Sequence, residues 1–226
     1  MKYVFIASLL LSMGSTIFAA PCSTGNLQNL IDLRADGCQV GAVTFSNFQI
    51  VPGQTDATVI SPAQVRFTTG GSSFNQLLML TLLNPTATSG QFLESIFRFS
   101  VSGAPLTEAS IAVTGSATGD GLVLGVLNVC PGARFTSNAI DGCPPAVAAI
   151  ALLNSEESTG RLLASFFDVF VDLTLDARPR GTATLTSATV GISAERGAVA
   201  AIPEPSAALM LAAGLAALAG LKARRT

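Results

Sequence analysis

The sequence predicts an all-β protein, an antiparallel β-sandwich with one short helix near its N-terminus. Segments rich in Val, Ile, Thr and Phe recur along the chain and are separated by Gly, Pro, Asn and Ser, a pattern typical of strands joined by turns. Residues 165–176 alternate with the period of two that a half-buried antiparallel strand requires. The chain has 226 residues. Without its two unusual ends, about 180 residues remain, which suits one domain.

Each predicted element has a local basis. Residues 26–36 are predicted as the short helix, because Leu27, Leu30 and Ile31 lie at helical spacing and Gly37 suits its C-terminal end. Residues 178–181 read as a turn between the two last strands. The strands are expected at residues 43–50, 57–60, 63–69, 76–83, 95–102, 110–118, 122–128, 165–176 and 182–193.

An internal similarity appears at an offset of 70 residues. Residues 82–101 align with residues 152–171, and eight of the twenty aligned positions are identical. Two similar hairpins in one domain would explain it. Chance alignment of strands rich in Leu, Ser and Phe would explain it equally well.

The N-terminus has the layout of a secretory signal peptide. Lys2 supplies the positive start, residues 4–11 form an apolar stretch too short to span a bilayer, and small residues lead to Ala19 and Ala20. Residues 1–19 are assigned as the signal peptide and residues 20–200 as the body, because Pro21 disfavours cleavage after Ala20. A lipoprotein signal is the alternative, but Pro21 stands where a small residue should precede Cys22.

Composition excludes several classes of function. The body from 21 to 202 holds eight Arg, no Lys and thirteen acidic residues, a net charge of 8 − 13 = −5. An acidic body disfavours nucleic acid as a partner. The chain has no His, so catalysis by a Ser–His or Cys–His pair within it is excluded. We expect no enzyme activity and no cofactor.

The four cysteines are Cys22, Cys38, Cys130 and Cys143. Without a CxxC pair, zinc-ribbon and thioredoxin-like sites are disfavoured. For an exported chain, two local disulfides, Cys22–Cys38 and Cys130–Cys143, are the simplest connectivity. Four free buried thiols are the alternative.

Several carboxylates are candidates for catalytic or metal-binding groups. Asp168, Asp172 and Asp176 share one face of the strand at 165–176, but four residues of strand span about 13 Å, too far for a glycosidase pair. We expect a solvated strand face there. The pair Glu156 and Glu157 reads as surface, and Asp120 and Asp141 read as turn residues. A calcium site built from such loops is the alternative, but no EF-hand spacing supports it. No metal site is therefore predicted.

The C-terminus has three parts in a fixed order. Pro203, Glu204, Pro205 and Ser206 come first, followed by an uncharged run of 15 residues at 207–221. With Ser206 this run would form a transmembrane helix of about 24 Å. Lys222, Arg224 and Arg225 follow, and cations there keep the end cytoplasmic while the body faces outward.

This order resembles the PEP-CTERM sorting signal, assigned to residues 202–226. The resemblance implies recognition by an exosortase, a membrane enzyme that cleaves near the motif and passes the protein to the cell surface or extracellular matrix of Gram-negative bacteria that make exopolysaccharide. An ordinary membrane anchor with a chance Pro-Glu-Pro triplet is the alternative. Residues 22–48, with Gly37-Cys38 and Ser46-Asn47-Phe48, are similar to the start of one group of PEP-CTERM proteins, which supports the first disulfide.

Three classes of function follow. The first is a non-catalytic surface or matrix protein, associated with exopolysaccharide or biofilm. The second is a carbohydrate-binding module, disfavoured because Trp is absent and Tyr3, in the signal peptide, is the one Tyr. The third, a secreted hydrolase, is disfavoured by the missing His and the unpaired carboxylates.

Overall fold

The computed structural model describes residues 19–195, apart from residues 52, 54–57, 73–74, 83–84, 137–140 and 144–145. Residues 1–18 of the predicted signal peptide lie outside the described residues. So do the predicted sorting signal, the transmembrane run and the basic end of the chain.

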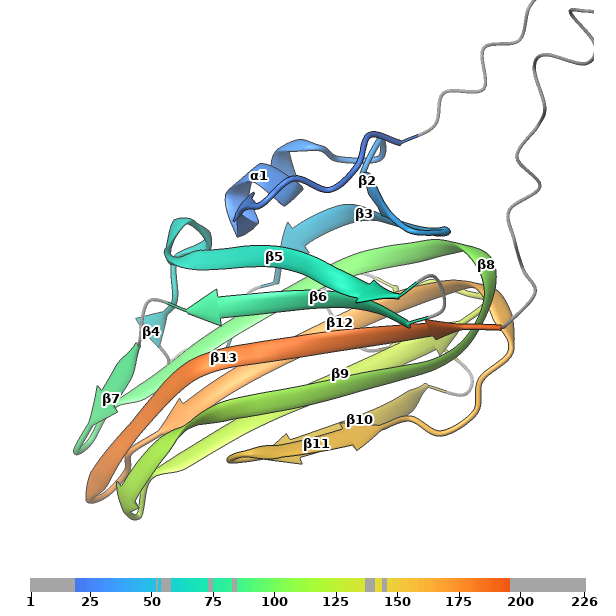
Figure 1. The fold of residues 1–226 in the computed structure, drawn as a ribbon. Coiled ribbons are helices and arrows are strands. Elements are labelled where there is room, and N and C mark those ends of the chain that lie inside the picture. Colours follow the sequence, from blue (N-terminus) through green and yellow to red (C-terminus); the bar gives the residue numbers. More distant parts are fainter. Residues whose placement is uncertain are drawn as a thin grey trace, which may run out of the picture.

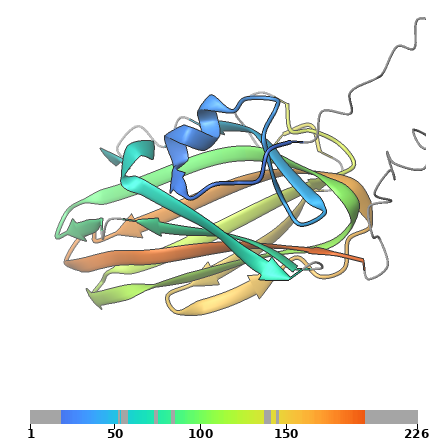
Figure 2. The same ribbon diagram turned by 45° about the horizontal axis from the view of Figure 1, so that its top comes forward.

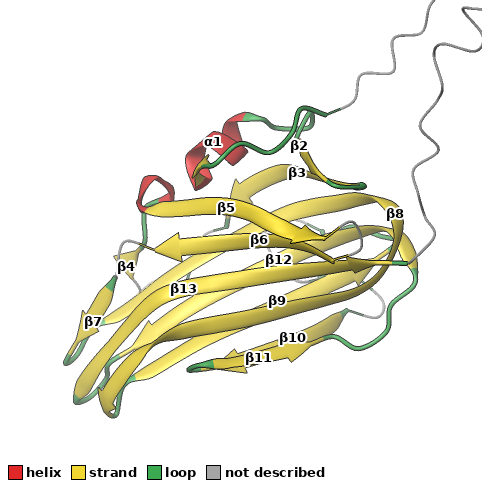
Figure 3. Ribbon diagram, viewed as in Figure 1, coloured by secondary structure: helices red, strands yellow, loops and turns green. Residues whose placement is uncertain are grey.

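The described chain is almost entirely β (Figure 3). Helix α1 spans Leu27–Asp32, and a 3-10 turn spans Pro62–Gln64. The strands are β1 (Gly25–Asn26), β2 (Cys38–Val40), β3 (Val43–Ile50), β4 (Thr58–Val59), β5 (Val65–Ser72), β6 (Asn75–Leu82), β7 (Thr86–Thr88), β8 (Phe92–Gly119), β9 (Leu122–Pro131), β10 (Val147–Leu152), β11 (Ser155–Ser158), β12 (Ala164–Asp176) and β13 (Gly181–Ala194).

One long strand organises the sheet. Strand β8 runs for 28 residues and bends at Gly103, after which it pairs with different neighbours (Figure 1). Before the bend it pairs with β3 and β12, and after the bend with β13 and β11. The backbone of Gly103 has φ +133°, and a Cβ added there would lie 2.2 Å from the carbonyl oxygen of Ala42. Only glycine fits a bend of this kind.

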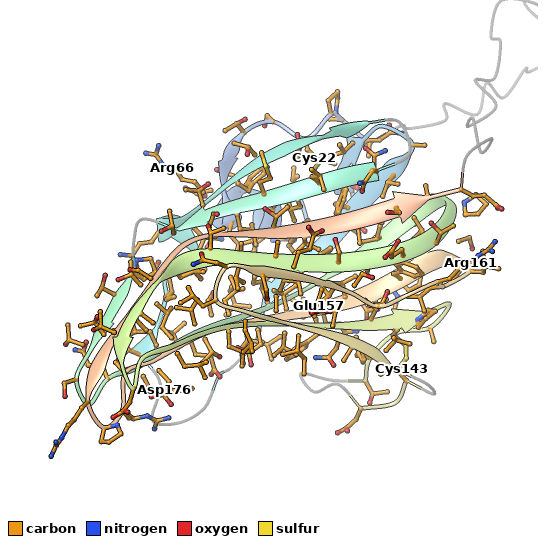
Figure 4. All side chains as sticks on the ribbon, turned by 60° about the horizontal axis from the view of Figure 1, so that its bottom comes forward. Cys22, Arg66, Cys143, Glu157, Arg161 and Asp176 are labelled. Atoms are coloured by element: carbon orange, nitrogen blue, oxygen red, sulfur yellow. A yellow bond between two sulfur atoms is a disulfide. The ribbon has the colours of Figure 1, made fainter. Side chains whose placement is uncertain are left out.

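The bend folds one continuous 13-stranded sheet into two facing layers. The first layer runs β3, β8, β12, β9, β10, and the second runs β5, β6, β13, β8, β11. Side chains of both layers meet in one apolar cluster, where Phe97 and Phe99 of the first layer and Leu78 and Ile111 of the second are at most 1% exposed. Figure 4 shows side chains filling the space between the layers.

Helix α1 closes one open edge between the layers. It contacts β3, at the edge of the first layer, and β5, at the edge of the second (Figure 2). Leu27 and Leu30 are buried in the common core. Asn26 caps the helix by accepting a hydrogen bond from the backbone of Asn29, whose own side chain accepts from Asn26 N. The cap explains why so short a helix begins there.

The all-β, antiparallel prediction with one short helix is confirmed, and the strand bounds are corrected. The predicted strands 95–102 and 110–118 are one strand, β8, because the residues between them pair through the bend. The helix is shorter than predicted and ends at Asp32. Five short strands were not predicted: β1, β2, β7, β10 and β11. One pairing, between β4 and β8, is parallel.

The similarity at offset 70 coincides with equivalent positions in the fold. The aligned segments contain β7 with the start of β8, and β11 with β12. These long strands pair with each other, and Phe99 lies opposite Val169, its own equivalent at offset 70. The short strands are also placed alike, β7 against β13 and β11 against β8. Neither aligned segment is a hairpin, because β7 pairs with β13 and not with β8, and β11 pairs with β8 and not with β12. The explanation by two similar hairpins is therefore wrong.

Candidate functional site

The two predicted disulfides are present. Cys22 is bonded to Cys38, and Cys130 to Cys143, so none of the described cysteines is a free thiol. The first disulfide ties the start of the body to β2, where the Gln39 N–H donates to the carbonyl oxygen of Ala20. The second closes the loop that follows β9. Both fit an oxidising, extracytoplasmic environment.

The second disulfide holds its loop over the outward face of the first layer. Phe135 of this loop is 3% exposed and packs against Phe170 of β12, with ring centroids 6.5 Å apart. Cys130, Ile96 and Val51 join the same cluster. The loop therefore creates a second, small core outside the main one. The part of the strand face that it covers is no longer in contact with water.

A buried ion pair lies under this loop. Arg98 of β8 donates from Nε to the Oδ2 atom of Asp168 on β12 at 2.9 Å, and its side chain is 10% exposed against 2% for Asp168. The same oxygen accepts from the backbone N–H of Phe135 at 2.9 Å, and Arg98 Nη2 donates to the Phe135 carbonyl oxygen at 2.6 Å. Ser100 donates to the other carboxylate oxygen at 3.3 Å. The two contacts with the Phe135 backbone position the loop, and the others join β8 to β12.

Two more carboxylates lie further along the same strands. Asp172 of β12 lies opposite Ile96 and two register positions from Glu94 of β8, which is 2% exposed. Burial raises the pKa of Asp172 to about 6, a hydrogen bond from Thr174 at 2.9 Å opposes the rise, and the nearby Glu94 carboxylate adds to it. Asp172 therefore exchanges its proton near pH 6.

The predicted solvated face of β12 is wrong for Asp168 and partly wrong for Asp172. Asp168 is buried and Asp172 is half-buried, because the disulfide-closed loop and the adjoining strands cover them. Asp176 behaves closer to the prediction. It pairs with Arg178 at 3.0 Å near the surface, and that hydrogen bond lowers its pKa. Sequence reasoning missed Arg98 and Glu94, since both partners come from a strand 70 or more residues away.

We call Arg98, Asp168, Asp172 and Glu94 the charged centre. Their contacts are those of a structural site. Asp168 accepts four hydrogen bonds from three residues, Arg98, Ser100 and Phe135. Glu94 is buried too deeply to reach an extended substrate. No group of three or more metal-ligating side chains was found among the described residues. The exposed Glu156 and Glu157, predicted as surface, lie on β11.

The outward face of the second layer has a different character. Three pairs of hydroxyl groups are hydrogen-bonded to each other here. The oxygen atoms lie 2.8 Å apart in Thr118–Thr182, 2.9 Å in Thr86–Thr184 and 2.6 Å in Thr114–Ser187. We call this surface the hydroxyl face, made of Thr86, Thr88, Thr114, Ser116, Thr118, Thr182, Thr184 and Ser187. The eight side chains come from three adjacent strands, β7, β13 and β8.

No known protein family, no curated protein and no solved structure matches this chain. The sorting-signal residues Pro203, Glu204, Pro205 and Ser206 and the basic residues Lys222, Arg224 and Arg225 lie outside the described part of the chain. Within the described residues, no helix is long and apolar enough to cross a membrane.

Proposed function

We propose that this chain is an exported, non-catalytic protein of the cell surface or extracellular matrix of a Gram-negative bacterium, processed by an exosortase. The observation that carries the proposal is the order of the C-terminal segments: Pro203-Glu204-Pro205-Ser206, then 15 uncharged residues, then three cations. The membrane holds the protein through this segment before processing. Association with exopolysaccharide or biofilm follows from the same resemblance.

The fold supports export in two ways. Both disulfides lie in the body and need an oxidising compartment. The hydrogen bond to Ala20 and the bridge between Pro21 and Gln39 bring the chain into the fold directly after the predicted cleavage site at Ala19. A mature chain that begins at Ala20 therefore keeps the contacts that fasten its N-terminus.

The charged centre supports a non-catalytic role. Its most buried carboxylate, Asp168, accepts four hydrogen bonds that hold Arg98, Ser100 and the loop at Phe135 in place. Groups with saturated partners in a covered site are poor acid–base catalysts, because a catalytic group must reach the proton that it transfers.

The test replaces the triplet and measures the mass of the surface protein. Pro203→Ala, Glu204→Ala and Pro205→Ala together should leave membrane insertion intact and block processing, so the form ending at Thr226 accumulates. Deleting the host's exosortase should give the same mass. A control with Arg196→Ala and Val199→Ser changes only residues that precede the sorting signal and should be processed like wild type. Identical intact masses for wild type and triplet variant would instead identify a simple anchor.

A carbohydrate-binding module is the second candidate, and the hydroxyl face is the observation that favours it. An aromatic platform does not: of the phenylalanines that the structure describes, Phe166 alone is not buried, and the Arg134 guanidinium lies 5.2 Å from its ring centroid. Binding to a glycan array separates this candidate from a purely structural role, and turnover of polysaccharide would point to a hydrolase.

A further inference from the structure

The outward surface of the second layer carries hydroxyl groups in a regular arrangement. Thr182 lies between Thr88 and Thr118 on the neighbouring strands, and Thr184 lies between Thr86 and Ser116. Neighbouring strands are about 4.8 Å apart, and successive outward residues on one strand about 6.8 Å apart. The hydroxyl face is thus a small grid with strand spacing in one direction and two-residue spacing in the other.

The hydroxyl pairs fix the orientation of this grid. A threonine hydroxyl can donate one hydrogen bond and accept two. The hydrogen bond between Thr118 and Thr182 uses one donor and one acceptor, so the pair can still donate one hydrogen bond and accept three from a ligand. The same holds for Thr114 and Ser187. Because the β-branched threonines are also restricted at χ1, little side-chain entropy remains to be lost when a ligand binds.

The charge of this surface restricts its partner. Around the hydroxyl face, the described outward residues of β6, β13 and β8 beyond its bend are uncharged: Leu77, Met79, Thr81, Ser110, Ala112, Thr189 and Gly191. One carboxylate, Glu108 of β8, lies on the same side opposite Ser193, at the end of the layer away from the hydroxyl face. The body as a whole carries −5. An anionic polymer would be repelled by such a body, whereas an uncharged polymer would not.

An apolar strip borders the hydroxyl grid. Met79 of β6 lies opposite Thr189 and is 37% exposed, and Leu77 lies opposite Gly191, which has no side chain to cover it. A polysaccharide presents hydroxyl groups at the edges of its sugar rings and C–H groups on their faces. Hydroxyl groups beside an aliphatic strip match both features without an aromatic residue.

We propose that the hydroxyl face, with Met79 beside it, binds an uncharged, hydroxyl-rich polysaccharide. The inference rests on the proposed function, from which it takes the presence of exopolysaccharide around the protein. It goes further by naming the surface and by selecting neutral over acidic polymers.

The test is affinity electrophoresis of the processed protein purified from the producing bacterium. Gels contain dextran, hydroxyethylcellulose or the neutral fraction of the host's exopolysaccharide, and parallel gels contain alginate as the acidic polymer. Thr118→Val with Thr182→Val removes one hydroxyl pair while keeping shape and β-propensity. Thr44→Val with Ser165→Ala removes two hydroxyls from the first layer as the matched control.

Wild type and control should be retarded by at least one uncharged polymer, and the T118V/T182V variant should bind it about tenfold more weakly. No retardation by any uncharged polymer, stronger retardation by alginate, or equal loss in both variants would overturn the proposal. Unchanged circular dichroism spectra of both variants would show that weaker binding is not caused by unfolding. A negative binding result would not contradict processing by an exosortase, because processing is tested separately by the mass of the triplet variant.

Discussion

Arg98 and Asp168, seventy residues apart in sequence, form a buried ion pair that also binds both backbone polar groups of Phe135. The pair joins the two central strands of the first layer to the loop closed by Cys130–Cys143. Loss of either partner leaves the other charge buried without compensation.

Asp168→Ala should therefore lower the free energy of unfolding by about 3–5 kcal/mol. The double variant Arg98→Met with Asp168→Leu should recover much of this loss, because it leaves neither charge of the pair buried without its partner. Asp176→Ala, which removes the more exposed pair with Arg178, should cost at most about 1 kcal/mol. Urea denaturation of the three variants measures these values, and a loss below about 1 kcal/mol in Asp168→Ala would contradict the structural role of the pair.

Removing the second disulfide should release the loop at Phe135. Cys130→Ala with Cys143→Ala should reduce stability by about 3 kcal/mol by the chain-entropy estimate. It should also speed hydrogen exchange at the Phe135 amide, which is otherwise bonded to Asp168. Cys22→Ala with Cys38→Ala is the control, since that disulfide lies at the other end of the body's chain and should leave this amide protected.

The pH dependence of stability should report Asp172. Its pKa rises from 3.8 to about 6 on folding, so the folded state binds the proton more tightly than the unfolded state. This contribution is fully present below about pH 4 and is lost as the pH rises through about 6. Because Asp172 is only half-buried, we expect a loss of about 1–2 kcal/mol over this window.

Asp172→Asn should flatten the change between pH 4 and 6 and make the protein more stable than wild type at pH 7. Asp176→Asn is the control, since the pKa of Asp176 is lowered and its contribution is lost as the pH falls. Unfolding midpoints in urea at pH 4, 5, 6 and 7 provide the measurement. An unchanged slope in Asp172→Asn would show that another group titrates there.

The bend of β8 should depend on Gly103. Gly103→Ala introduces a Cβ 2.2 Å from the Ala42 carbonyl oxygen in a backbone with φ +133°, and should cost at least about 2 kcal/mol. Gly90→Ala is the matched control, because Gly90 also has a positive φ of +83° but nothing lies within 4 Å of the added atom. Thermal unfolding should show the larger loss in Gly103→Ala, and equal losses would refute a steric cause.

In the tail, the three cations should act separately from the Pro-Glu-Pro triplet. Replacing Lys222, Arg224 and Arg225 by Gln should weaken membrane retention and orientation, because these cations are the topological stop. The triplet variant should retain both. Protease accessibility of the C-terminus from outside the inner membrane distinguishes the two variants, and an inaccessible C-terminus in the Gln variant would exclude this role.

Several features could be predicted from sequence because they depend on neighbouring residues. The strand at 165–176 follows from its alternation, and both disulfides follow from the local spacing of the cysteines in an exported chain. The turn at 178–181 follows from its proline and glycine. The leader and tail patterns are also linear, so the proposals built on them need no tertiary structure.

Tertiary structure decided which strand faces are covered and which residues meet there. Alternation made the Asp168 side of β12 polar, but only the loop carrying Phe135 buries it, and only β8 brings Arg98 and Glu94 to it. Likewise the threonines of β8 and β13 pair because the bend at Gly103 turns β8 onto the second layer. Periodicity fixes the two sides of a strand. What covers each side depends on contacts across 33 or more residues here, which no local pattern encodes.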